Sequence, residues 1–197
     1  MILNKEQTCC LSGHRPSKLP WGYNEDFVCC KRFKADLKQL LLKVINGGIK
    51  RFFTGMAEGF DMIATEILLE LRAYNSIEIV AVLPCMRQEK LWSVSQQKRY
   101  HNILEKCDGS ILISKEYTCT CMNERNRYMV DNSSIVVAGY DNLSSGGTRN
   151  TITMANKQDL RVVVINTNNY REIEKEKYPT NTVGYFFNNH RRCRHLF

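Results

Sequence analysis

Short apolar runs alternate with longer amphipathic segments along this chain. Glycine, proline or polar residues end most of the apolar runs, and the runs are nearly continuous rather than alternating in polarity. That pattern is typical of strands that are buried on both faces of a parallel sheet. Strands are predicted over residues 8–12, 51–54, 77–83, 110–113, 134–138 and 161–165.

The longer segments carry apolar residues at the spacing of one helical face, as Phe33, Leu37 and Leu41 do. Helices are predicted over residues 25–44, 61–74, 92–107, 123–132 and 147–158. Strands that alternate with helices form βαβ units. The sequence therefore predicts an α/β fold: a single Rossmann-like, doubly wound and mostly parallel sheet with helices on both faces. The periodic pattern fades near the end, so we assign residues 1–167 to this domain and 168–197 to a basic C-terminal extension.

Glycines and polar residues follow the predicted strands, where ligands of such sheets bind. Because the carboxyl ends of parallel strands share one edge, these residues are expected to form one rim, with Pro84 ending the third strand. The candidates are Gly13, His14 and Arg15 after the first strand; Gly55, Met56, Ala57, Glu58 and Asp61 after the second; and Asp141, Ser145, Gly146, Gly147 and Thr148 after the fifth.

The segment Ser145-Gly146-Gly147-Thr148 precedes a predicted helix and has the features of a phosphate cradle. Glycines let the backbone approach a ligand closely, and a helix N-terminus presents free N–H groups with a partial positive charge. Thr148 and Thr151 add hydroxyl donors. An ordinary glycine-rich turn with a threonine cap remains an equal alternative. The segment matches neither a Walker A loop nor G-x-G-x-x-G.

Two carboxylates and a basic stretch complete the candidates. Asp61 and Glu58 suit either helix capping or ligand chemistry, meaning hydrogen bonds to ribose hydroxyls or general acid/base work. Arg125 and Asn126 belong to a helix from which one arginine is expected to reach the rim. Trp92 and Tyr100 offer an aromatic wall for a base, although core packing is the favoured interpretation.

The first turn reads Ser12-Gly13-His14-Arg15-Pro16. Arg15 has the planar fork that suits a phosphate, and His14 can donate or accept a hydrogen bond. Pro16 restricts the backbone at the exit. The turn is thus predicted to contact the ligand.

Composition narrows the function only slightly. The 197 residues are 43% hydrophobic with a net charge of +8, which fits one globular domain with anionic partners. Nine cysteines cannot all pair within one chain, so reduced thiols and a cytoplasmic location are expected. No metal site, cofactor, signal peptide or membrane segment is predicted. Homo-oligomerisation stays open.

Four motifs in this order resemble the YpsA-like branch of the SLOG superfamily: S-G-H-R-P, G-M-A-E-G-F-D, R-N-R-x-M-V-D and S-G-G-T-x-x-T. That superfamily includes the LOG phosphoribohydrolases and the Rossmann-like domain of DprA. The resemblance implies a nucleotide or ADP-ribose-like ligand at the glycine-rich rim. It matches Gly146, Gly147 and Thr148 to the phosphate-binding element.

One departure bears on catalysis. LOG enzymes carry a motif similar to P-G-G-x-G-T-x-x-E. In this chain, Thr153 stands in place of the final glutamate. A threonine cannot stabilise an oxocarbenium-like centre as a carboxylate does. The leading hypothesis is therefore a module that senses or sequesters a nucleotide-derived ligand. The alternatives are a nucleoside-monophosphate N-glycosidase or related transferase that uses Glu58 or Asp61, and a DprA-like binder of single-stranded nucleic acid.

Overall fold

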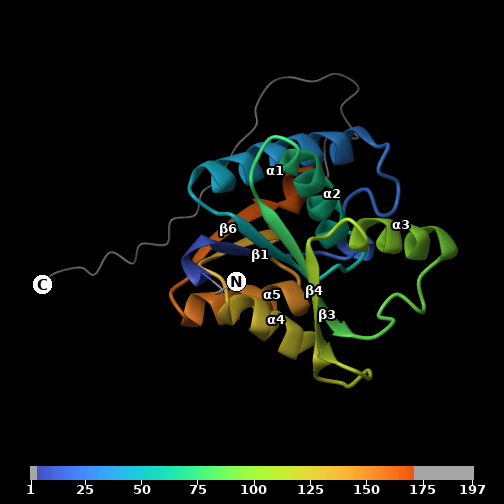
Figure 1. Cartoon of the computed structure of the whole chain (residues 1–197). Helices are drawn as coiled ribbons and strands as arrows, with labels where there is room; N and C mark the ends of the chain where they lie inside the picture. Colours follow the sequence, from blue (N-terminus) through green and yellow to red (C-terminus); the bar gives the residue numbers. More distant parts are fainter. Residues whose placement is uncertain (1–3, 171–197) are drawn as a thin grey trace, which may run out of the picture.

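The computed structural model describes residues 4–170, which form one six-stranded sheet flanked by helices (Figure 1). All neighbouring strands run parallel, in the order β4-β3-β2-β1-β5-β6. The strands are β1 (Thr8–Gly13), β2 (Arg51–Thr54), β3 (Glu78–Cys85), β4 (Gly109–Ser114), β5 (Ile135–Tyr140) and β6 (Arg161–Asn166). The predicted α/β architecture is thus confirmed, with a sheet that is entirely parallel.

Helices cover both faces of the sheet. The helices are α1 (Val28–Asn46), α2 (Phe60–Arg72), α3 (Val94–Leu104), α4 (Cys121–Asp131) and α5 (Gly147–Lys157). Helices α1 and α2 pack on one face and α4 and α5 on the other (Figure 1). Short 3₁₀ helices span Lys5–Gln7, Pro16–Lys18 and Thr167–Tyr170. The chain moves outward from β1 to β4 and then returns to β5 on the other side of β1, so β1 and β5 flank the topological switch point.

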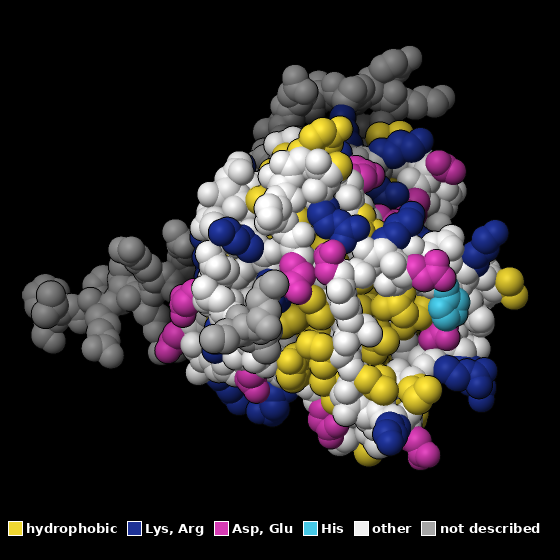
Figure 2. All heavy atoms as spheres, in the orientation of Figure 1, with side chains coloured by type: hydrophobic (Ala, Val, Ile, Leu, Met, Phe, Trp, Pro, Cys, Tyr) yellow, Lys and Arg dark blue, Asp and Glu magenta, His cyan; other side chains and the backbone are white. Residues whose placement is uncertain are grey.

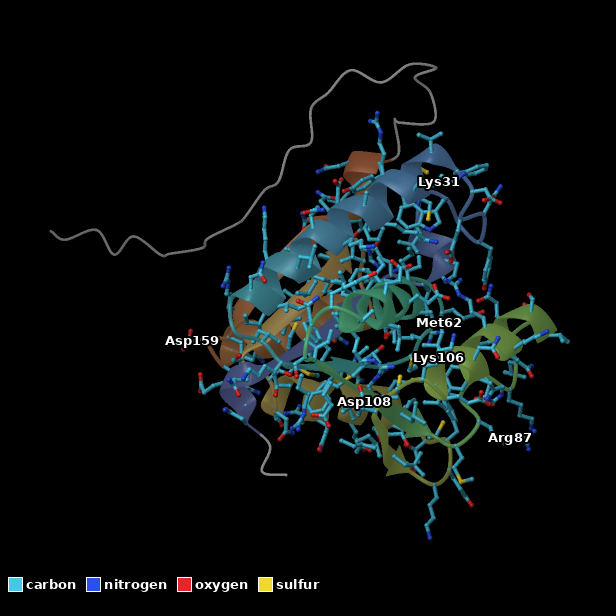
Figure 3. All side chains as sticks on the ribbon, turned by 45° about the horizontal axis from the view of Figure 1, so that its top comes forward. Lys31, Met62, Arg87, Lys106, Asp108 and Asp159 are labelled. Atoms are coloured by element: carbon cyan, nitrogen blue, oxygen red, sulfur yellow. The ribbon has the colours of Figure 1, made fainter. Side chains whose placement is uncertain are left out.

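Apolar residues on both faces of the strands build the core, as the continuous runs predict. Phe33, Leu37 and Leu41 of α1 are fully buried against the sheet. Met62 of α2, labelled in Figure 3, joins Tyr100 of α3 in a separate cluster beside β3. Trp92 packs edge-on against Tyr100 at 5.5 Å, in agreement with the core-packing interpretation.

Phe60 occupies the switch point because two glycines leave room for it. A Cβ on Gly13 of β1 would lie 2.2 Å from the Phe60 ring, and one on Gly139 of β5 would also lie 2.2 Å from it. The first residue of α2 therefore fills the space between the ends of β1 and β5. Any side chain at either glycine would displace the ring.

Pro84 does not end β3, contrary to expectation. The strand continues to Cys85, and its pairing with β2 ends at Thr54 and Ala81. Beyond Ala81 the side of β3 that faced β2 is free of that ladder, which is where a residue without an N–H is tolerated.

The described fold continues past residue 167, the predicted end of the domain. The Tyr170 ring packs on Phe33 of α1 at 5.3 Å. The rest of the predicted C-terminal extension, residues 171–197, lies outside the described residues. No helix within residues 4–170 is long and apolar enough to cross a membrane.

Candidate functional site

A cavity of about 270 Å³ opens at the carboxyl ends of β1 and β5. The turns after β1 and β2, the first turns of α4 and α5, and the loop before α5 all contribute to its wall. Its lining includes Gly13, His14, Arg15, Ala57, Asp61, Arg125, Asn126, Ser145, Gly146, Gly147 and Thr148. Turns far apart in sequence therefore meet at one rim.

Arg125 lies at the base of this cavity and is almost completely buried. Helix α4 brings its guanidinium against Gly55, where a Cβ would lie 1.4 Å from Nη1. The nearest charge is Asp61, whose Oδ2 is 3.9 Å from Nη1, beyond hydrogen-bond distance. Among residues 4–170, Nε and Nη1 are buried without a hydrogen-bond partner. Buried N–H groups without hydrogen bonds cost folding free energy, so these two donors indicate a position that suits a hydrogen-bond acceptor.

Asp61 is tied to the backbone of the turn after β2. Its Oδ2 accepts a hydrogen bond from the Ala57 N–H at 3.3 Å. Burial raises the pKa of Asp61, although Arg125 and the Ala57 N–H oppose the shift. Burial likewise lowers the pKa of Arg125, with Asp61 opposing. Each group thus partly compensates the other's loss of water.

The first turn of α5 forms the opposite wall. Gly146 has φ 128° and ψ −164°, a conformation open essentially to glycine alone. A Cβ at Gly146 would lie 3.6 Å from Lys18 Nζ, and one at Gly147 would lie 3.7 Å from Asn126 Nδ2. Lys18 Nζ donates to the Ser145 carbonyl at 2.6 Å. The helix N-terminus is therefore flanked by an ammonium group and an amide.

His14 joins the turn after β1 to the loop after β5. Its Nε2 lies 3.1 Å from both the backbone N and the Oδ1 of Asp141. Asp141 also accepts from the N–H groups of Leu143 and Ser144 and from the Ser144 hydroxyl. Burial alone would raise the pKa of Asp141, but the hydrogen bonds from Ser144 and Leu143 hold it well below its ordinary value. The pair fixes the loop that leads into α5.

A second cluster lies at the mouth. Arg15 Nη1 is 4.0 Å from Glu58 Oε2, and its Cζ is 5.8 Å from the centre of the Trp92 ring. The Tyr23 hydroxyl donates to Glu58 Oε1 at 3.4 Å. Burial raises the pKa of Glu58, and Arg15 opposes the shift. Glu58 is 9% exposed, yet both of its contacts are long.

The sequence that forms this sheet and its rim matches the model of a known family. A family model described as the YspA SLOG family matches residues 9–177. The chain belongs to the YpsA SLOG family.

The names of two relatives of this chain state no activity. The identities and coverages below are those of the YpsA SLOG chain described here. It is 33% identical to the uncharacterized SPbeta prophage-derived protein YoqJ of Bacillus subtilis, covering 61% of this chain and 81% of YoqJ. It is 23% identical to a UPF0398 protein of Brevibacillus brevis, covering 85% and 92%. A solved structure of DNA processing protein A from Helicobacter pylori, described for its single-stranded DNA binding mode, aligns with a TM-score of 0.55. The alignment has 19% identity and covers 88% of this chain and 74% of that one. That likeness concerns the fold.

Five predicted site residues of the YpsA SLOG chain lie outside the cavity lining: Gly55, Met56, Glu58, Asp141 and Thr151. Gly55 and Asp141 instead support residues that do line it. The Met56 side chain is fully buried in the core. The Thr151 hydroxyl donates to the Gly147 carbonyl at 3.0 Å.

Ser12 of the first turn also lines the cavity. The structure adds lining residues that the sequence pattern did not single out: Leu11, Ser17, Lys18, Met122, Asn123 and Arg149. Lys18 is the most informative, because it contributes a cation from just beyond Pro16. The sequence signal that could have found Lys18 is its position as a basic residue two residues after Pro16, which ends the turn after β1.

Other members of the basic stretch lie away from the cavity. Arg127 and Thr153 line a different pocket, together with Asn150 and Lys157. The Asp131 carboxylate, also in this stretch, accepts a hydrogen bond from Gln158 Nε2. Arg125 and Asn126 of this stretch line the cavity, together with Met122 and Asn123.

Proposed function

We propose that the cavity binds a small phosphate-bearing nucleotide as a binding module, with the phosphate on the first turn of α5. The observation that carries the proposal is Arg125, whose buried Nε and Nη1 have no acceptor in the part of the chain that the structure describes. An anionic or carbonyl-bearing ligand would supply the missing acceptor. No neutral apolar ligand would do so.

The charge of the lining supports an anion. Arg15, Lys18, Arg125 and Arg149 contribute cations, and Asp61 contributes the one carboxylate among the lining residues. The free N–H groups of α5 add a partial positive charge at its first turn. A phosphate there would be held by charge-assisted hydrogen bonds, which are shorter and stronger than neutral ones.

The cavity volume limits the ligand. About 270 Å³ is near the lower end of the range for small-molecule sites, roughly 300–1,000 Å³. The enclosed part therefore suits a mononucleotide-sized group. A longer ligand such as ADP-ribose would extend past Arg15 toward Glu58, Tyr23 and Trp92 at the mouth.

Calorimetry with AMP, ADP-ribose, NAD, adenosine and inorganic phosphate tests the proposal. Phosphorylated ligands are expected to bind, adenosine is expected to bind far more weakly, and Arg125→Met should abolish the difference. Arg127→Met is the matched control, because Arg127 lies on the same helix but lines a different pocket. Absence of binding by every phosphorylated ligand would overturn the proposal.

The glycosidase alternative is tested on the same ligands. Asp61 is buried, accepts a hydrogen bond from the Ala57 N–H and lies beside Arg125, which supports a positioning role and leaves Glu58 as the freer carboxylate. Release of free base from AMP, lost in Glu58→Gln, would establish an enzyme. Binding without turnover would support the binding module.

Single-stranded DNA is the third ligand to test, because the Helicobacter pylori protein of similar fold is described as binding it. Glu58 beside Arg15 reduces the positive charge at the mouth, where a phosphodiester backbone would pass. We therefore expect weak retention of single-stranded DNA. Tight retention that falls steeply with salt would favour the nucleic-acid hypothesis over a mononucleotide site.

A further inference from the structure

Lys18 joins two walls of the cavity beside the first turn of α5. It ends the 3₁₀ helix that follows β1, and its ammonium group donates to the Ser145 carbonyl at 2.6 Å in the loop before α5. Both residues line the cavity, so this hydrogen bond ties the two walls together. An ammonium group has three N–H donors, and the Ser145 carbonyl takes one of them. The other donors can therefore serve a ligand.

Hydrogen-bond donors from three segments meet at the first turn of α5. The first N–H groups of this helix, at residues 147–149, have no partner within the helix, and Gly146 at the N-cap has no side chain to accept from them. A Cβ at Gly146 would lie 3.6 Å from Lys18 Nζ, and one at Gly147 would lie 3.7 Å from Asn126 Nδ2. An oxygen-rich group at this turn would thus be within reach of the helix, the ammonium and the amide.

Arg125 is an independent indication that the same cavity takes an anion. It is 6% exposed, and its Nε and Nη1 lack acceptors among residues 4–170. Four cations line the cavity against the single carboxylate of Asp61. On the face of the molecule that Figure 2 shows, by contrast, Lys and Arg side chains are interspersed with Asp and Glu. The excess of positive charge in the cavity is therefore a local feature, and it suits a group with more than one negative charge.

A terminal phosphate fits these donors better than a bridging phosphate does. A phosphomonoester has three acceptor oxygens and a charge of roughly −1.5 to −2 at pH 7. A phosphodiester has one acceptor oxygen fewer and a single negative charge. Its second ester group would also have to pass a turn that the hydrogen bond between Lys18 and Ser145 closes on one side.

We propose that this turn recognises a terminal phosphomonoester and that Lys18 is the residue that selects it, by donating to the third phosphate oxygen. The inference rests on the proposed function and narrows it from any phosphate-bearing nucleotide to one whose phosphate is terminal. Ligands in which every phosphate is bridged, such as NAD and ADP-ribose, bind this turn more weakly.

Calorimetry on the full chain compares AMP with adenosine 5′-methylphosphate, in which a methyl group blocks one phosphate oxygen. The wild type should bind AMP at least about tenfold more tightly than the methyl ester, as expected for one additional charge-assisted hydrogen bond. Lys18→Met should weaken AMP about tenfold and the methyl ester less than about twofold, so that the preference is lost. Lys157→Met, in the last turn of α5 and in a different pocket, is the matched control and should bind both ligands as the wild type does.

Thermal melting checks that each variant folds. If Lys18→Met fails to fold, Lys18→Gln decides, because it removes the charge but keeps N–H donors for the Ser145 carbonyl. Equal affinity of the wild type for AMP and the methyl ester would overturn the inference and leave the proposed function standing. Equal losses of both ligands in the Lys18 variant would also overturn it, because Lys18 would then only hold the cavity wall. Absence of AMP binding by the wild type would overturn the proposed function and this inference with it.

Discussion

Replacing the buried pair Arg125 and Asp61 separates a ligand-binding role from an architectural one. The two side chains lie 3.9 Å apart without a hydrogen bond, and Arg125 Nε and Nη1 lack acceptors among the described residues. At an effective dielectric constant of about 20, that separation corresponds to roughly 4 kcal/mol of attraction. Two buried N–H donors without hydrogen bonds cost about 1–3 kcal/mol each, so this desolvation penalty is similar in size to the attraction between the two charges.

Arg125→Met alone strands the Asp61 carboxylate and should cost about 3–5 kcal/mol, as removal of one partner of a buried pair does. For a chain of this length that corresponds to a fall in Tm of roughly 6–20 °C. The double variant Arg125→Met with Asp61→Asn removes both charges, and the new amide oxygen can still accept from the Ala57 N–H. We expect its stability without ligand to equal or exceed that of the wild type.

Chemical denaturation gives the free energies of unfolding, and calorimetry gives the affinity for AMP. Both variants should lose phosphate-dependent binding, while only the single variant loses stability. Equal destabilisation of the single and double variants would refute the reasoning, because Arg125 would then be holding the architecture. Retained binding in the double variant would refute it from the other side.

Three further substitutions test neighbouring contacts. Gly55→Ala puts a Cβ 1.4 Å from Arg125 Nη1, so thermal melting should show a stability loss of about 1–3 kcal/mol and calorimetry a loss of AMP binding. Gly109→Ala, whose Cβ would have no atom within 4 Å, is the control and should change neither stability nor binding. AMP binding retained by Gly55→Ala would contradict this account. Asp141→Asn should cost about 1.5–3 kcal/mol at pH 7. The pKa of Asp141 is lowered in the folded protein, so its carboxylate contributes stability at pH values above the unfolded-state pKa of about 3.9. In denaturation series, the difference in free energy of unfolding between the wild type and Asp141→Asn should therefore shrink as the pH falls below about 4. A difference that does not change with pH would show that the Asp141 charge is not its cause. Glu58→Gln should weaken ADP-ribose about tenfold but leave AMP nearly unchanged in calorimetry; equal losses would show that Glu58 does not contact the part of the ligand that extends past the cavity.

The sheet could be predicted because each strand and helix carries its own period. Apolar runs and three-to-four spacing specify the elements locally, and the handedness of βαβ connections limits their order. The predicted end of β3 at Pro84 was wrong, because the effect of a proline on a strand depends on whether a neighbouring strand pairs at that position. A missing N–H ends a strand only where a partner strand needs that donor, and β2 has already stopped at Thr54.

The rim could be predicted as a set of turns, but not the role of each residue. Glycines at 13, 55 and 146 look alike in the sequence, yet the first makes room for Phe60, the second for Arg125 and the third adopts φ 128°. Those differences arise from segments that meet only in the fold. Lys18 was missed for the same reason, since its partner Ser145 lies far along the chain.

Local rules are broken where the cavity is built. Met56 adopts φ 53° although it is a fully buried methionine. Such a conformation costs about 1–3 kcal/mol, and it lies in the turn that carries Ala57 to the Asp61 carboxylate. Arg125, which packs against Gly55 in that same turn, carries the unmet donors described above. A fold that only needed stability would keep neither feature, so their coincidence at one rim favours selection for a bound ligand.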